Sequence, residues 1–293
     1  MTPVGTSHHP PPRRADFWGI RGHYSEARHR LKVALDSDAA PTEPRAKALI
    51  AAADAAMAAG EIQASRRSAE GALAIFEAVD NPRGVAQSRF FLADAAANEG
   101  DWETGRALFE ESVRAFRALG DEHQTLWASR MLGWMYTELG DTERSRPLHA
   151  GNLARARAIG NSHVEAQSLD ALASLAADEG RREEAVSLLQ DSFRIWDGLE
   201  DVFRTGVTLV RLAAAVAEHS PSDAVRLIAS AQRPLENSGA KPPWVGRMEE
   251  RALATVRRLL RDDHFDAAWA EGKRLKPHDV FDVVVRSTQA IEP

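Results

Sequence analysis

Cysteine is absent from this chain, which excludes disulfide bonds, thiolate metal sites and cysteine nucleophiles. No uninterrupted apolar run reaches the ~18 residues that a membrane span needs, so the sequence predicts no contact with a membrane. Basic residues number 37 and acidic residues 43, a net charge of −6. Because phosphate neutralisation needs a basic surface, we expect no direct nucleic-acid partner. These absences fit a cytoplasmic protein.

Catalytic motifs are missing as well. The sequence contains no G-x-x-x-x-G-K-[ST] phosphate loop, no G-x-S-x-G elbow and no H-E-x-x-H metal motif. Its one Gly-Lys pair, Gly272-Lys273, lacks the following hydroxyl residue, and the ten histidines are scattered. We therefore expect no enzymatic activity, no nucleotide binding, no metal and no cofactor.

A pattern with a period of 40 residues fills most of the chain. Turn residues recur at this spacing, and a second series of turn and capping residues lies halfway between them. Such a period indicates a solenoid, in which each repeat buries its apolar face against its neighbours. The first series is Gly60, Gly100, Gly140, Gly180 and Ser220, and the second is Asp80-Asn81, Gly120-Asp121, Gly160-Asn161 and Glu200-Asp201.

Each period reads as two helices of about 18 residues joined by a tight turn, an antiparallel hairpin. Asn81 and Asp101 are suited to cap the two helices of one repeat, and Gly120 to end the second. Small residues recur seven positions before the turn and five positions after it, where two helices must approach closely. They are Ala53, Ala93, Gly133, Ala173 and Ala213 before it, and Ser65, Gly105, Ser145 and Ala185 after it.

This arrangement resembles the tetratricopeptide repeat, in a version longer than the usual length of about 34 residues. The resemblance covers residues 41–240 as five helix pairs. It implies an all-α fold, a right-handed α-solenoid whose first helices line a concave groove. The remaining chain divides into a disordered tail at 1–12, a partial first repeat at 13–40 and capping helices at 241–293.

The end of the chain extends the resemblance. Helices are predicted from Trp244 to about Leu260, over Phe265–Glu271, and from Pro277 to about Val285. The segment FDAAWAEGKRL is similar to the tails of bacterial regulators that carry a STAND-class NTPase core and a LuxR-type or SARP-type DNA-binding domain. What this implies is a sensory or assembly module, either a fragment of such a regulator or a stand-alone relative. The N-terminal half repeat leaves an apolar face without a partner, so self-association is expected there.

One repeat departs from the pattern. Pro147 falls inside its second helix, His149 replaces a large apolar residue, and Asn152 replaces a serine. Either this irregularity is tolerated near the helix start, or it marks a hinge or a ligand-facing defect.

The groove implied by the resemblance suggests a binding site. The candidate contact residues are Phe90, Asp94, Trp127, Arg130, Trp134 and Asp170. Trp127, Arg130 and Trp134 share one helical face, and aromatics beside an arginine are typical of interaction hot spots. The alternative is that one or both tryptophans pack between repeats. Two functions remain open: a scaffold for a protein or peptide partner, and a solenoid that binds a small-molecule effector.

Overall fold

The computed structural model describes residues 30, 31, 33, 35, 36, 40–237 and 243–289. Throughout these residues the regular structure is helical, and no strand occurs among them. The chain forms two compact units, residues 1–135 and 136–293. The prediction of an all-α fold built of antiparallel helix pairs is confirmed.

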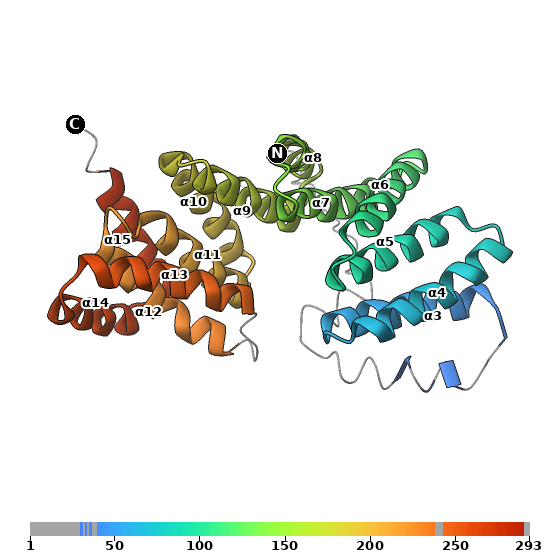
Figure 1. Ribbon diagram of the computed structural model, residues 1–293, viewed down its shortest axis with the longest axis horizontal. Helices are drawn as coiled ribbons and strands as arrows, with labels where there is room; N and C mark the ends of the chain where they lie inside the picture. The colour runs from blue at the N-terminus through green and yellow to red at the C-terminus, as the bar shows by residue number, and fades with distance from the viewer. Residues whose placement is uncertain (1–29, 32, 34, 37–39, 238–242, 290–293) are drawn as a thin grey trace, which may run out of the picture. The chain divides into compact units, whose positions relative to one another are not determined.

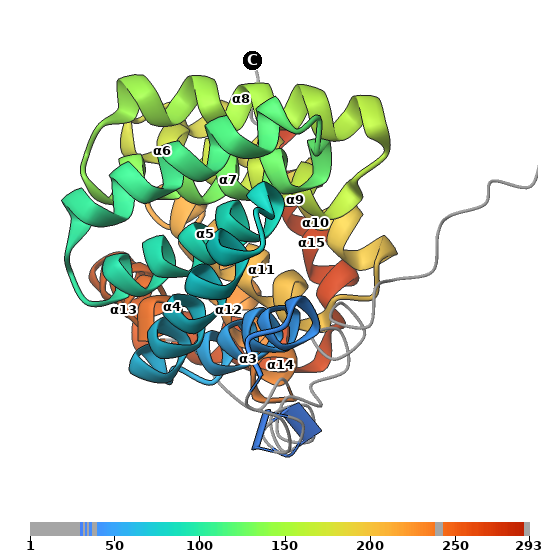
Figure 2. The same cartoon turned by 90° about the vertical axis from the view of Figure 1, so that its right-hand side faces the viewer.

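Unit 1 contains two complete helix pairs and most of a further helix. α3 packs on α4, α4 on α5, and α5 on α6, so the helices stack in the order of the chain (Figures 1 and 2). The bounds are α3 Glu43–Ala58, α4 Ile62–Ala78, α5 Pro82–Asn98, α6 Trp102–Ala118 and α7 Glu122–Glu138, and the unit boundary falls inside α7.

Unit 2 continues the pairs and adds three helices. α9 packs on α10, α11 on α12, and α12 on α14. The bounds are α8 Thr142–Ile159, α9 Ser162–Asp178, α10 Arg182–Gly198, α11 Val202–Val216, α12 Pro221–Asn237, α13 Pro243–Leu259, α14 Asp262–Arg274 and α15 Pro277–Gln289.

The turns follow the capping pattern of the sequence. Asn81 and Asp101 each accept a hydrogen bond from a backbone N–H of the helix that follows, at 2.9 and 3.2 Å. Asp80 and Glu200 take the left-handed conformation without being glycine, at φ 50° and 56°. The six glycines with positive φ are Gly60, Gly100, Gly120, Gly140, Gly160 and Gly180.

The fifth turn is built differently. α11 ends at Val216, two residues earlier than the register of the other first helices would place its end. Its carbonyl accepts hydrogen bonds from the N–H groups of His219 and Ser220 at 3.1 and 2.8 Å. Ser220 stands where the other repeats have glycine, and it is not in the left-handed region. The shorter helix replaces the glycine turn.

The recurrent small residues lie at close helix contacts, as predicted. A Cβ at Gly105 would lie 3.1 Å from the carbonyl oxygen of Ala93 and 2.8 Å from Cε of Met135. All the small residues that the pattern identified are buried. They are Ala53, Ala93, Gly133, Ala173 and Ala213 before the turn, and Ser65, Gly105, Ser145 and Ala185 after it.

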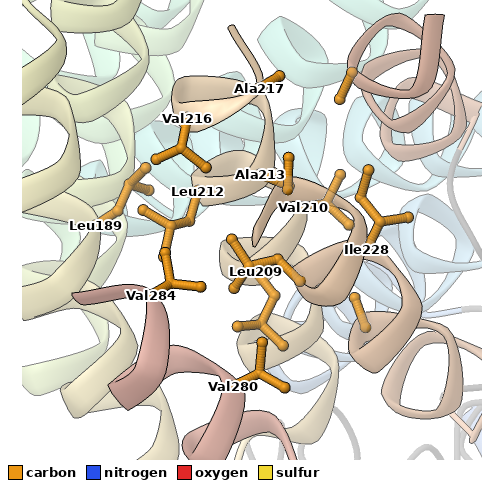
Figure 3. Packing of buried hydrophobic residues seen from close by; sticks show 14 of the residues in the cluster. Leu189, Leu209, Val210, Leu212, Ala213, Val216, Ala217, Ile228, Val280 and Val284 are labelled. Atoms are coloured by element: carbon orange, nitrogen blue, oxygen red, sulfur yellow. The ribbon is translucent and has the colours of Figure 1, made fainter. Parts of the chain in front are cut away.

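The apolar core of unit 2 gathers around α11. Figure 3 shows Val280 and Val284 of α15 beside Leu209 and Leu212 of α11, and all four side chains are buried. The C-terminal helices thus complete a core that the last repeat alone would leave exposed.

Two of these terminal helices differ from the prediction. α14 runs over Asp262–Arg274 instead of 265–271, because acidic residues in its first turn and basic residues in its last turn suit the helix dipole. α15 reaches Gln289 instead of residue 285.

The irregular repeat keeps a continuous second helix. Pro147 is exposed inside α8, whereas His149 and Asn152 are buried at 1% and 5% exposure. The predicted hinge stays a prediction.

At the N-terminus, the predicted tail at 1–12 and most of the predicted partial repeat at 13–40 lie outside the described residues. Residues 30, 31, 33, 35 and 36 are helical, and the carbonyl of Leu35 accepts a hydrogen bond from Arg45 at 2.7 Å. Self-association through this segment stays a prediction.

Candidate functional site

Trp127 is the most exposed of the candidate residues. Its side chain on α7 is 41% exposed. The guanidinium carbon of Arg130, one turn later, lies 4.4 Å from the centre of the Trp127 ring. A guanidinium over an indole is held there by the ring quadrupole, so the two side chains form one flat surface. We call Trp127, Arg130 and the neighbouring Asp94 the Trp127 surface.

Phe90 supports this surface from below. It is 6% exposed, and its ring centre lies 6.5 Å from that of Trp127 and 5.4 Å from that of Phe109. A partner would reach Trp127 before it reached Phe90.

Trp134 has a different environment from Trp127. It is half-buried, and its ring centre lies 6.2 Å from that of Trp102, the first residue of α6. Trp127 and Trp134 share a helical face, but Trp127 is exposed to solvent whereas Trp134 packs against Trp102 of the neighbouring helix.

Asp94 places a carboxylate beside Arg130. It is partly buried on α5, and the side-chain amide of Asn98 donates to its Oδ1 at 3.1 Å. Burial raises the pKa of Asp94 from 3.8 to about 6, and the charge of Asp54 on α3 adds to this. Arg130 and Asn98 lower the pKa of Asp94, but less than burial raises it.

This raised pKa makes unit 1 less stable as pH rises. The folded state holds the Asp94 proton up to about pH 6 and the unfolded state only to 3.8, so stability falls between these values. We expect Asp94→Asn to have a free energy of unfolding about 1 to 3 kcal/mol higher than that of the wild type at neutral pH. At about pH 4 the difference between the two proteins should be smaller. Urea unfolding at both pH values measures this, with exposed Glu70→Gln as the control. An equal difference at both pH values would contradict it.

Asp170 lies in unit 2 and is 5% exposed. Its Oδ1 accepts a hydrogen bond from Ser192 Oγ at 2.7 Å, and its Oδ2 accepts one from the indole N–H of Trp196 at 3.1 Å. The carboxylate is thus enclosed by its own repeat, and the structure does not present it to a partner.

Sequence reasoning missed several residues around these candidates. Asp54 is 40 residues before Asp94, so the repeat register could have identified it. Arg204 and Trp196 surround Asp170 but have no counterparts of the same type 40 residues earlier, so the register gave no signal for them.

Two further properties bear on the site. Among the described residues, no group of three or more His, Cys, Asp or Glu is arranged to hold a metal ion. None of the helices described is both long enough and apolar enough to span a bilayer.

Comparison with known proteins agrees with this helix-pair architecture. Residues 85–150 match the tetratricopeptide repeat model. None of the curated proteins matches this chain. The match covers α5 from residue 85 onward, α6, α7 and the first half of α8, and therefore includes the Trp127 surface.

Solved structures share the fold over most of the chain. A Rap protein complexed with competence and sporulation factor is 15% identical over 93% of this chain and 74% of its own, with a TM-score of 0.68. The apo form of RapI is 13% identical over 84% and 96%, with a TM-score of 0.58. A STAND protein with a tetratricopeptide repeat sensor from Pyrococcus horikoshii is 14% identical over 93% and 42%, with a TM-score of 0.65. Identities this low establish the fold alone.

Proposed function

We propose that this chain is a non-catalytic scaffold that binds a protein or peptide partner through the Trp127 surface. The observation that carries the proposal is the 41% exposure of Trp127 with Arg130 stacked on its ring. Tryptophan and arginine are enriched among the residues that contribute most to binding. Support also comes from Rap proteins of the same fold, which have been solved with competence and sporulation factor and with the Phr* peptide.

The more specific proposal is that the chain is the regulatory or sensory tail of a bacterial STAND-class ATPase of the LuxR or SARP type, or a stand-alone relative. The similarity of residues 265–275 to such tails and the fold shared with the Pyrococcus horikoshii sensor support it. Sequencing of the gene around this chain tests the proposal directly. A coding sequence for an NTPase core, continuous with that of this chain, would support a regulator tail.

The binding proposal is tested with peptides selected from a random phage-displayed library. We expect Trp127→Ala and Arg130→Ala each to weaken binding of the selected peptides by about 30-fold or more, measured by calorimetry. Leu119→Ala is the matched control, because Leu119 has a similar exposure of 43% and lies at the end of α6. Failure to select any peptide, or full affinity in Trp127→Ala, would contradict the proposal.

Melting curves separate binding from folding in the same variants. Trp127→Ala should lower the melting midpoint less than Trp134→Ala does, because 41% of Trp127 is exposed, whereas Trp134 is half-buried. Trp134→Ala should lower the stability of unit 1 by about 2 to 4 kcal/mol, because Trp134 packs on Trp102. A thermal-shift screen of metabolites tests the small-molecule alternative, since a ligand that binds the native state raises the melting midpoint.

A further inference from the structure

The second helix of the irregular repeat, α8, buries almost no large apolar side chain. The structure describes every residue of α8, and the buried ones are polar or small: Ser145, His149, Asn152 and Ala156. The second helix of the next repeat, α10, buries large apolar residues, among them Val186, Leu189, Phe193 and Trp196. Because burial of apolar surface is what mainly holds a helix in a fold, α8 is held less firmly by packing than α10.

Asn152 also weakens the packing of α8. Its side chain is 5% exposed, and its amide nitrogen Nδ2 has no hydrogen-bond acceptor among the described residues. The serine at this position of α10, Ser192, donates to Oδ1 of Asp170 at 2.7 Å. A buried donor without an acceptor gives up its hydrogen bond to water and gains none in return. Opening of α8 would restore that bond for Asn152.

Two residues weaken the backbone of α8. Pro147 has no N–H, so the carbonyl of Glu143 loses its helical hydrogen bond. Gly151 lies in the middle of the helix, where glycine is unfavourable. A Cβ at Gly151 would meet nothing within 4 Å, so packing does not require a glycine there. Side chains and backbone therefore both make α8 easier to open than α10.

Ion pairs hold both ends of α8. Near its start, Arg146 pairs with Glu179, the residue after α9, at 2.7 Å and with Glu184 of α10 at 3.8 Å. Near its end, Arg157 pairs with Glu165 of α9 at 2.8 Å. The side chains of all three pairs are partly exposed, so each pair contributes little and is screened by salt.

We propose that α8 is a releasable helix, which leaves α9 and unfolds locally while α9, α10, α11 and α12 stay folded. The ion pairs of Arg146 and Arg157 act as the latch that keeps it closed. Elements of one fold open with very different free energies, and those with few buried apolar contacts open most readily. Release uncovers the side of α9 on which α8 packs. The fold thus contains a conformational switch that is controlled by charge.

This switch goes beyond the proposed function and does not depend on it. α8, α9 and α10 all lie in unit 2, and none of their residues belongs to the Trp127 surface. The peptide-binding experiment and the experiments below therefore succeed or fail separately.

Amide hydrogen exchange of the full chain, followed by mass spectrometry, measures the opening. The middle of α8, residues 148–154, is compared with the middle of α10, residues 188–194, after correction for intrinsic exchange rates. We expect α8 to be less protected than α10 by about 100-fold or more, with α9 as protected as α10. Equal protection of α8 and α10, or an α9 that exchanges as fast as α8, would overturn the proposal.

Variants assign the opening to the polar buried face. His149→Leu combined with Asn152→Ser gives α8 the residues that α10 has at the same positions, and should raise the protection of α8 by about tenfold or more. The matched control is Ala150→Leu combined with Ala154→Ser, which introduces the same residues at exposed positions of α8. The proposal fails if the first protein shows no more protection of α8 than the control does.

Salt and Arg146 test the latch. Raising sodium chloride from about 50 to about 500 mM should speed exchange in α8 by about threefold or more and leave α10 unchanged. Arg146→Gln should do the same at low salt and make α8 less sensitive to salt. Arg194→Gln is the control, since Arg194 pairs with Asp191 inside α10 at 3.0 Å. No effect of salt on α8, or an equal effect on α10, would rule out the latch.

Discussion

Asp170→Ala should lower the free energy of unfolding of unit 2 by about 3 to 5 kcal/mol. The carboxylate is 5% exposed and connects Ser192 and Trp196 of α10 to α9. Its removal leaves the Trp196 indole N–H and the Ser192 hydroxyl without this acceptor, and it takes away a negative charge that helps to compensate Arg204.

Guanidinium chloride unfolding, followed by circular dichroism, measures this loss. Asp178→Ala is the matched control because Asp178 is exposed at the end of the same helix, and we expect a change within about 0.5 kcal/mol. A comparable loss in both variants would mean that the effect comes from α9 itself and not from the network.

Gly272→Ala should be the second strongly destabilising change. A Cβ at Gly272 would lie 2.4 Å from the carbonyl oxygen of Arg226 and 2.8 Å from its Cα. These are backbone atoms of α12, so α14 would have to move away as a whole, and the Arg226–Glu271 ion pair at 2.7 Å would be disturbed. We expect a loss of about 3 kcal/mol, at the upper end of typical overpacking.

Gly246→Ala should have the opposite effect and raise the stability of the protein slightly. Gly246 lies inside α13, and a Cβ there would meet nothing within 4 Å. Alanine favours a helix over glycine by about 1 kcal/mol, so this variant should be slightly more stable. Parallel melting curves test both, and a stable Gly272→Ala protein would show that α14 is less closely held against α12 than the structure has it.

The helix pairs could be predicted from the sequence because turn and capping residues, small residues and apolar residues all follow the same period. Asn81, Asp101 and Gly105 each have a role that depends only on local position, and each is where the register placed it. The ends of α14 were missed because no repeat constrains them.

The candidate site was harder to predict because exposure depends on neighbours that the period does not fix. Trp127 and Trp134 have the same helical phase, yet only Trp134 meets a second tryptophan, since Trp102 happens to begin α6. Asp170 was grouped with the binding residues from its register, but Ser192 and Trp196 enclose it. Long polar and aromatic side chains from adjacent helices therefore determine whether Trp134 and Asp170 are exposed.

The buried small residue of each first helix has a further consequence for how such a protein can change. Ala53, Ala93, Gly133 and Ala173 hold the helices together, and the residue after each of them is free to differ. That next residue is Asp54, Asp94, Trp134 and Ser174 in successive repeats. Under the proposed function, selection can therefore alter recognition one repeat at a time, while the adjoining position that sets the helix spacing stays small.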